Sequence, residues 1–370
     1  MTLEITTELP DGLTLGFAGS ADREEQAALY DRCFRKTEGM RVIPWRYDGC
    51  PHGMTICSVA RSAAGELVSS YACAPRQVSH FGDTATAAPV GQVGDVMTHP
   101  DFRSKGVFSS LNWAAIAEAQ RAGVPFTWGL PNDNSGHLFF GKLGWVLAGH
   151  IGPWTFVLRA DDGARKVRWS AGRLAAAAVP LVRWQSARRR AQLRQRYPRL
   201  QARPLRRFPE AVDAIHAAVA PRFAYMLRRD HAYLNWRFID APSGAFRPVG
   251  VFSPESELRG WVVTQPPRGD ERMGYIVDLC AIDDEAVAAS LEAGLALLEQ
   301  TGASAVRAYA MQHSWWEEQL AWIGFRPPKS GGYKEVGAYI IDADHPLSSA
   351  YHTKDWYFTD GDRDDETVRS

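Results

Sequence analysis

The stretch 93–111 constrains the fold of this chain most, because it reads as a strand, a short loop and the start of a helix. Amide groups at the start of a helix converge on an anion, and the helix dipole adds partial positive charge there. Gly106 has no Cβ and lets the main chain approach a phosphate, while Arg103 and Lys105 can add charge-assisted hydrogen bonds. The stretch therefore predicts a pyrophosphate site, against the alternative of an ordinary strand-to-helix loop.

Strand and helix patterns alternate along residues 13–150 and return along residues 208–345. Short apolar, β-branched runs indicate strands, and apolar residues at helical spacing, as in 108–122, indicate helices. Residues 155–159 read as the last strand of the first half. The sequence therefore predicts an α/β (α+β) protein with domains at 1–160 and 208–370, joined by a helical linker at 161–207.

The segment 160–207 is rich in arginine, with Arg188, Arg189 and Arg190 in succession. A charge run of this kind is typical of a solvated helical linker. The alternative is a basic amphipathic helix that contacts anionic lipid or a phosphorylated substrate. The linker is favoured because the apolar face of the segment is weak, so membrane contact stays the lesser alternative.

Charge and cysteine content narrow the class of protein further. The 370 residues include 42 Lys and Arg against 42 Asp and Glu, so the surface as a whole does not favour a nucleic-acid partner. The five cysteines form no C-x-x-C pair, and no metal-ligand spacing with histidine is visible. We expect no metal. The N-terminus lacks a signal-peptide pattern and no apolar run is long enough to span a bilayer, so the expected location is cytoplasmic.

The loop at 103–108 resembles the acyl-CoA signature of the GNAT N-acetyltransferase superfamily, R/Q-x-x-G-x-G/A at the start of a helix. Arg103, Gly106 and Phe108 stand at its three defined positions. The approach 99–103 and the runs 132–137 and 140–145 also resemble the family. The resemblance implies a GNAT fold, a mixed and mostly antiparallel sheet flanked by helices. It also implies acetyl-CoA, or another acyl-CoA, as co-substrate, bound by Val96, Met97, Thr98, Arg103, Ser104, Lys105, Gly106, Val107, Phe108, Asn132, Asn134 and Phe140.

Two positions depart from the family pattern. Phe108 replaces a small residue of the loop, although its backbone N–H stays available for the pyrophosphate. Phe140 stands where many relatives have a tyrosine that protonates the leaving thiolate, and a phenyl ring has no proton to donate. Either another residue does this work or the thiolate leaves without an acid, which the ordinary pKa of a thiol, near 8.5, allows.

Residues 208–345 resemble a second, degenerate GNAT fold. Asp278 occupies the place of Asp95, and the run 322–325 resembles 142–145. The loop after this strand holds Asp283, Asp284 and Glu285, carboxylates that cap a helix but repel a pyrophosphate. We therefore predict two tandem GNAT-like domains, of which the second does not bind coenzyme A. Its expected role is structural, or to build the acceptor pocket.

Transfer of an acyl group to an amine requires that the amine lose a proton. In the family a carboxylate often lies near the acceptor on the strand before the loop, so Asp95 is predicted as base or amine-positioning group, against a structural hydrogen-bonding role. His99 and His137 are further catalytic candidates, each more often structural. Main-chain N–H groups at 96–98 would meet the oxyanion.

Arg237, Asp278 and His313 are predicted to bind the acceptor from the second half. Arg237 could hold a substrate phosphate or carboxylate, or equally be a paired structural arginine. Segments 233–238 and 355–362 resemble tandem GNAT proteins of bacterial surface-sugar pathways, and the aromatic, acidic tail reads as a lid or a packed terminus. The oligomeric state is not predicted.

The resemblance implies an acyl-CoA-dependent N-acyltransferase that acetylates a small amine, such as a nucleotide-linked amino sugar in polysaccharide biosynthesis. Two alternatives stay open. The first is a non-catalytic acyl-CoA-binding module, which the missing tyrosine at Phe140 favours. The second is an aminoacyl or peptidyl transferase that acts on a lipid-linked substrate, which the basic segment fits.

Overall fold

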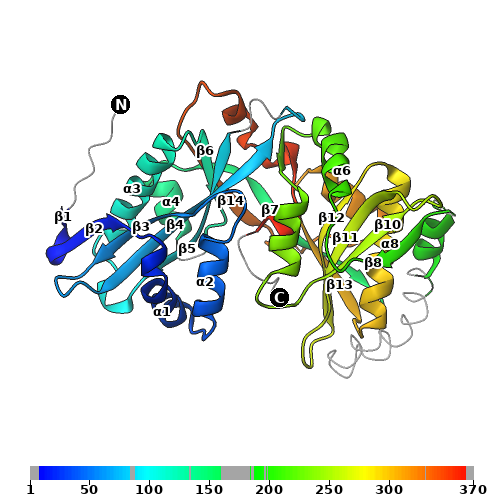
Figure 1. The fold of residues 1–370 in the computed structure, drawn as a ribbon, viewed down its shortest axis with the longest axis horizontal. Coiled ribbons are helices and arrows are strands. Elements are labelled where there is room, and N and C mark those ends of the chain that lie inside the picture. The colour runs from blue at the N-terminus through cyan, green and yellow to red at the C-terminus, as the bar shows by residue number, and fades with distance from the viewer. Residues whose placement is uncertain are drawn as a thin grey trace. The chain divides into compact units, whose positions relative to one another are not determined.

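The computed structural model describes residues 8–83, 88–132, 135–159, 184, 187–195, 197, 199–329 and 331–363 (Figure 1). Asn134 and most of the predicted linker 161–207 lie outside the described residues. The chain divides into two compact units: Met1–Gly149 with Glu335–Thr353, and His150–Lys334 with Lys354–Ser370. In both units the sequence prediction of strands flanked by helices is confirmed.

The first unit contains a sheet in the order β1-β2-β3-β4-β5-β6-β14, antiparallel except for the β5–β6 pair. Its strands are β1 (Glu8–Leu9), β2 (Leu13–Phe17), β3 (Ile56–Arg61), β4 (Leu67–Ser79), β5 (Pro89–Thr98), β6 (Phe126–Gly129) and β14 (Lys334–Ile340). Its α-helices are α1 (Arg23–Phe34), α2 (Gly39–Tyr47), α3 (Val107–Arg121) and α4 (Gly136–Lys142).

Apolar side chains on both faces of this sheet form two cores. One cluster joins α1 and α2 to the sheet through residues such as Tyr30, Ile43 and Met97. The other joins α3 and α4 through residues such as Leu111 and Phe139. The two helix pairs therefore cover opposite faces of the sheet. Successive side chains of β4 point to opposite faces, so this strand contributes residues to both clusters.

The middle of this sheet opens at one point. Ser70 pairs with Met97 and Ala72 with Gly94, so Tyr71 alone faces both Asp95 and Val96, which makes a β-bulge. The parallel pairing of β5 with β6 covers only 91–93 and ends where β6 ends, at Gly129. From residue 94 to 98, β5 has no described strand beside it on the β6 side.

The second unit has a sheet in the order β7-β13-β12-β11-β10-β8, in which only β12 and β13 are parallel. The strands of this sheet are β7 (Val146–Val157), β8 (Gln201–Pro204), β10 (Arg247–Phe252), β11 (Leu258–Gln265), β12 (Met273–Ala281) and β13 (Ala305–Met311). Two short strands of the unit lie outside this order and pair with each other in parallel, β9 (Tyr225–Leu227) and β15 (Trp356–Tyr357). Its α-helices are α6 (Ala211–Val219), α7 (His231–Leu234), α8 (Asp284–Gln300) and α9 (Trp315–Ile323), and residues 187–195 are also helical. A short 3-10 helix, η8 (Asp360–Asp362), follows β15.

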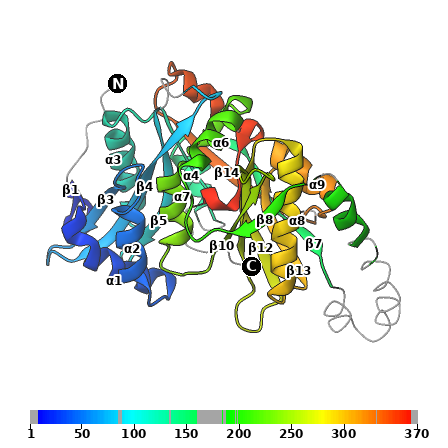
Figure 2. The same cartoon turned by 45° about the vertical axis from the view of Figure 1, so that its right-hand side comes forward.

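The chain exchanges strands between the two units. β7 follows α4 in sequence, but its residues 151–157 pair antiparallel with β13. β14 follows α9 in sequence, yet it pairs antiparallel with β6. The strand predicted at 155–159 therefore exists within β7, and it completes the sheet of the second unit. Figure 2 lets the reader follow β7 and β14 from a second direction.

Candidate acyl-CoA site and active site

The loop that precedes α3 has the geometry of an anion site. Ser104 and Gly106 both have positive φ, 64° and 78°, and Gly106 is the residue before the first turn of the helix. The amides from Ser104 to Phe108 donate hydrogen bonds to no acceptor among the described residues. The first turn of α3 carries no acidic residue. These free donors at the positive end of a 15-residue helix suit a phosphate or pyrophosphate.

The basic side chains of this loop lie at its surface. Arg103 is exposed, and its Nε donates to the carbonyl oxygen of Thr98 at 3.1 Å. Lys105 pairs with Asp11 at 2.8 Å and lies over the ring of Phe102. Arg103 therefore adds positive charge to this loop, while Asp11 offsets the charge of Lys105.

Phe108 does not obstruct this loop. Its ring packs into the core, 6.1 Å from the ring of Tyr71 and 5.3 Å from that of Phe139, measured between centroids. The side chain therefore points away from the anion site while the backbone N–H stays at the helix start. The departure from the small residue of the family signature leaves the loop amides in place.

The other residues predicted to bind acyl-CoA lie on the unpaired end of β5 and at or just before α4. Val96 is half-buried and Met97 is buried, while Thr98 shares a hydrogen bond with Ser69 at 2.9 Å. Asn132 lies in the turn before α4, where its side-chain oxygen accepts from the amide of Ser135, the N-cap residue of the helix, at 3.1 Å. Phe140 is half-buried and packs against the α3 and α4 core. Its ring offers no proton for a leaving thiolate.

Asp95 lies on the bulge of β5 with φ 44°. Its Oδ2 accepts hydrogen bonds from Arg46 at 2.5 Å and from the Tyr47 hydroxyl at 3.2 Å, both at the end of α2. Burial, followed by the nearby carboxylate, raises the pKa of Tyr47 well above its usual value, so the phenol stays a donor. Oδ1 of Asp95 has no hydrogen-bond partner among the described residues. Sequence reasoning missed Arg46 and Tyr47, which carry no recognisable motif.

The predicted histidines lie in turns and on the surface. His99 begins a 3-10 helix, where its Nδ1 accepts from the amide of Asp101 at 3.3 Å, and its Nε2 lies 2.5 Å from Arg32. His137 is exposed on α4. His313 is also exposed, and its amide donates to Glu317 before α9. Neither His99 nor His137 forms a hydrogen bond with Asp95 in the described residues. Of the three catalytic candidates, Asp95 is the one that lies on β5 itself, within the stretch that β6 does not pair.

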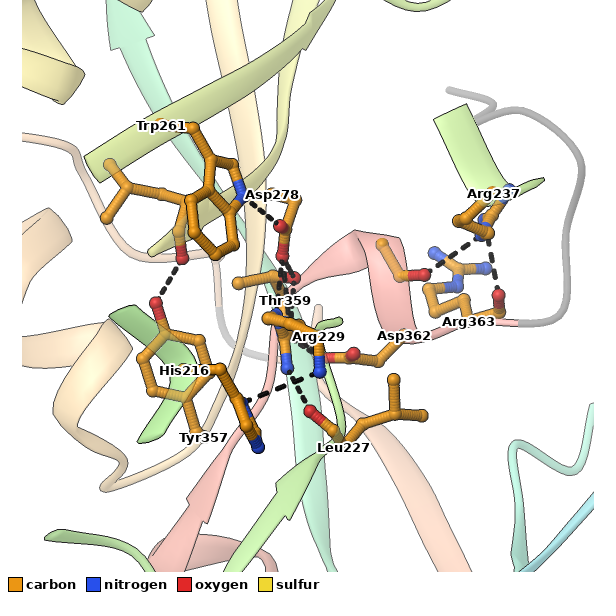
Figure 3. Close-up of polar contacts among 12 residues, drawn as sticks. His216, Leu227, Arg229, Arg237, Trp261, Asp278, Tyr357, Thr359, Asp362 and Arg363 are labelled. Carbon is orange, nitrogen blue, oxygen red and sulfur yellow. Dashed lines mark hydrogen bonds and ion pairs between the residues drawn. The ribbon is translucent and has the colours of Figure 1, made fainter. Parts of the chain in front are cut away.

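The second unit repeats the strand arrangement of the first. β12 pairs in parallel with β13 only at 273–275, and a register shift against β11 places a bulge beside Asp278. Asp278 is again paired with an arginine: Arg229 Nε donates to Oδ1 at 3.1 Å, and Trp261 donates to Oδ2 at 2.9 Å (Figure 3). Arg229 also pairs with Asp362 at 2.6 Å, and all three ionised side chains are buried.

The opening that this arrangement creates is occupied by the C-terminal segment of the chain. η8 packs against both β12 and β13, and Asp360 accepts the amide of Tyr309 on β13 at 3.0 Å. Thr359 donates to Asp278 at 2.7 Å. The tail is therefore a packed terminus, one of the two readings that its sequence left open.

Arg237 holds the same segment. Its Nε donates to the carbonyl oxygen of Gly361 at 3.0 Å and its Nη2 to that of Arg363 at 3.2 Å (Figure 3). Of the two roles that the sequence left even, these contacts favour the paired structural arginine. Asp278 is likewise engaged in the buried network, and the acceptor role of both residues stays a prediction.

The helix start that corresponds to the anion site is also closed in the second unit. Asp283 accepts the amide of Ala286 at 2.8 Å, which caps α8, and its other oxygen pairs with Arg259 at 2.7 Å. Asp284 and Glu285 follow in the first turn. Carboxylates at this position satisfy the helix amides themselves and repel an anion.

An opened parallel strand pair beside a helix start with free amides is the arrangement that the sequence resemblance implies for an acyl-CoA-dependent N-acyltransferase. A family model described as an acetyltransferase (GNAT) domain matches residues 17–148, which include the loop and Asp95. Residues 17–148 therefore match a GNAT acetyltransferase domain, as the sequence resemblance predicted, and this match supports an N-acetyltransferase. A comparison with curated proteins found no match.

Solved structures share the fold of the chain across both units. A GCN5-related N-acetyltransferase from Anabaena variabilis has a TM-score of 0.61 at 12% identity, over 89% of this chain and 73% of that chain. Saccharomyces cerevisiae N-myristoyltransferase with bound myristoyl-CoA has 0.58 at 12%, over 91% and 85%. A GCN5-related glucosamine N-acetyltransferase region of a fungal β-N-acetylglucosaminidase has 0.55 at 14%, over 89% and 38%. At these identities the likeness establishes the fold alone.

Two further features are absent from the residues that the structure describes. None of their helices is both long and apolar enough to cross a membrane. They also contain no group of three or more His, Cys, Asp or Glu side chains placed to hold a metal ion.

Proposed function

We propose that the first unit transfers an acyl group from acyl-CoA to the amine of a small acceptor. The observation that carries the proposal is the row of unpartnered amides from Ser104 to Phe108 at the start of α3, beside the strand that bears Asp95. In this assignment the loop holds the pyrophosphate, and the opened edge of β5 receives the arm that ends in the thioester.

The chemistry requires that the amine nitrogen attack the thioester carbonyl while the C–S bond breaks. Main-chain N–H groups at 96–98 stabilise the oxyanion. The amine loses a proton, which Asp95 assists as base or by orienting the N–H. The thiolate takes up a proton from water, because Phe140 has none to give and the ordinary pKa of a thiol makes it a tolerable leaving group.

The acceptor is proposed to be an amino sugar, such as a nucleotide-linked one, in a cytoplasmic pathway of polysaccharide biosynthesis. Its support is the resemblance of segments 233–238 and 355–362, together with the similarly folded fungal glucosamine N-acetyltransferase region. The yeast structure with myristoyl-CoA leaves the acyl chain open, so donors of several lengths belong in the test.

The test combines calorimetry with a thiol-release assay. Acetyl-CoA should bind to the full chain, and free coenzyme A should appear when an amine from a panel of amino sugars, their nucleotide conjugates and polyamines is added. A chain that binds acetyl-CoA but releases no thiol with any amine would instead be the non-catalytic module that the missing tyrosine at Phe140 favours. Absence of acetyl-CoA binding would refute the proposal.

A further inference from the structure

The Asp95 carboxylate is held asymmetrically. Its side chain is only 9% exposed, and both donors that it contacts, Arg46 and Tyr47, bind the same oxygen, Oδ2. Oδ1 is left without a partner among the described residues, although the side chain is nine-tenths buried. Oδ1 is not one of the fully buried atoms that lack a partner, so the small exposed part of the side chain leaves this oxygen open to accept a hydrogen bond from a ligand.

Fold stability alone does not explain this arrangement. Asp95 has φ 44°, a left-handed conformation that costs an L residue roughly 1–2 kcal/mol. Replacing a buried ion pair by apolar side chains is often neutral for stability, because desolvation offsets the attraction between the charges. A strained residue and a buried pair at the opened edge of β5 together fit a functional site better than a structural one.

The guanidinium of Arg46 is itself fixed in place. Its side chain is 6% exposed, and its central carbon lies 5.9 Å from the ring of Tyr30 on α1. The Tyr47 hydroxyl from α2 bonds the same oxygen, Oδ2, and the Cys57 thiol from β3 lies close enough to interact with Asp95. Arg23 lies over the ring of Tyr47, and burial raises the pKa of Cys57 to about 11. The hydroxyl and the thiol both stay protonated near neutral pH, so Arg46 is the charged partner that orients Asp95.

We propose that Arg46 is a positioning residue: it fixes Oδ2 of Asp95 and thereby presents Oδ1 to an N–H of the acceptor amine. The inference rests on the proposed function. It narrows the role of Asp95, because a carboxylate paired with a guanidinium orients an amine more readily than it removes the proton. No new bond forms or breaks beyond the acyl transfer already described: the proton that the amine loses passes to solvent, and the thiolate takes up a proton from solvent, so the protons balance.

The experiment compares R46M, R46K and D95N, together with the double variant R46M/D95N, in the full chain. At saturating acetyl-CoA, R46M should lower kcat/KM for the best amine of the panel about 10- to 100-fold, the effect of one charge-assisted bond. R46K should recover part of this loss. In the D95N background R46M should add little, because both changes remove the same interaction.

The matched control is R76M. Arg76 is another buried arginine of the same sheet, on β4, where it donates to Gln92 at 2.8 Å. R76M should lower the melting temperature without a selective loss of kcat/KM for the amine. R46M should leave the calorimetric affinity for acetyl-CoA unchanged, because the loop at 103–108 is intact.

Three outcomes would overturn the inference: an equal cost of R46M with and without Asp95, an equal loss in R76M, or no recovery in R46K. Full activity of D95N would instead refute the assigned role of Asp95 while the acyl-CoA site stands. If no amine is acetylated, crystal structures of R46M decide, because an Asp95 carboxylate that keeps its position without the guanidinium contradicts the inference.

Discussion

The substitution of Gly106 by alanine isolates the contribution of loop geometry to acyl-CoA binding. Gly106 has φ 78°, and a Cβ added there would meet no atom within 4 Å. The variant therefore introduces no steric clash and no charge. In the free protein its only cost is conformational, because an alanine in the left-handed region is disfavoured by about 1–2 kcal/mol; a Cβ that also crowds the bound pyrophosphate would add to the loss of affinity.

The conformational cost of the alanine appears as a weaker affinity of the variant for acetyl-CoA. The loop is exposed, so in the free variant it can relax to a backbone that no longer aligns the amides of Ser104–Phe108. The binding-competent form must then be recovered when the ligand binds, which weakens the apparent Kd by the same free energy. An energy of 1–2 kcal/mol corresponds to a roughly 5- to 30-fold weaker Kd for acetyl-CoA.

Gly123 provides the control at the other end of the same helix. It follows α3 with φ 74°, and a Cβ there would also meet nothing within 4 Å. G123A should carry the same conformational cost in the left-handed region, and any loss of thermal stability should be no smaller than that of G106A. Its Kd for acetyl-CoA, measured by calorimetry beside G106A and the parent, should not change.

Two results would refute this reasoning. G106A could bind acetyl-CoA as tightly as the parent chain, which would mean that the amides of the loop do not hold the donor. Alternatively, G123A could lose as much affinity as G106A, in which case the loss would report general destabilisation of α3.

Three further predictions concern the second unit. Calorimetry should give one acetyl-CoA per chain, because the tail fills the second opening and Asp283 caps α8; a stoichiometry of two would contradict this. R229M should lower the free energy of unfolding in urea by about 3–5 kcal/mol, since it leaves Asp278 and Asp362 buried without their guanidinium, and a loss below about 1 kcal/mol would be inconsistent with that pairing. Burial, with the charge of Asp278 adding to it, raises the pKa of Asp362 to about 6, above its unfolded value. The stabilisation that this carboxyl provides is therefore present below about pH 4 and lost as pH rises through 6. Between those limits the free energy of unfolding of the parent chain should fall relative to that of D362N by at most roughly 3 kcal/mol. A difference between the two chains that does not change with pH would count against the raised pKa.

The anion site could be predicted from the sequence because its geometry is local. A strand, a glycine that adopts positive φ and the first turn of a helix lie within 93–111, and their order alone directs the amides of the loop to one point. The closed helix start of the second unit was predictable for the same reason, since Asp283 caps its own helix.

The partners of Asp95 and Arg237 could not be predicted in this way. Arg46 is 49 residues before Asp95, and Gly361 is 124 residues after Arg237. No periodicity or motif joins such pairs, because the contact exists only after the sheet and helices have packed. The left-handed backbone of Asp95 was equally hidden, since it follows from the register of β4 against β5.

The exchange of β7 and β14 has a consequence for synthesis of the chain. Residues of β6 leave the ribosome long before β14, their antiparallel neighbour, has been translated. This edge of β6 therefore stays unpaired, open to solvent or chaperones, until residue 340 has been translated and has emerged. A fragment that ends at Gly149 would keep this edge of β6 unpaired, so expression of residues 1–149 alone should yield aggregates unless the 335–353 segment is supplied in trans.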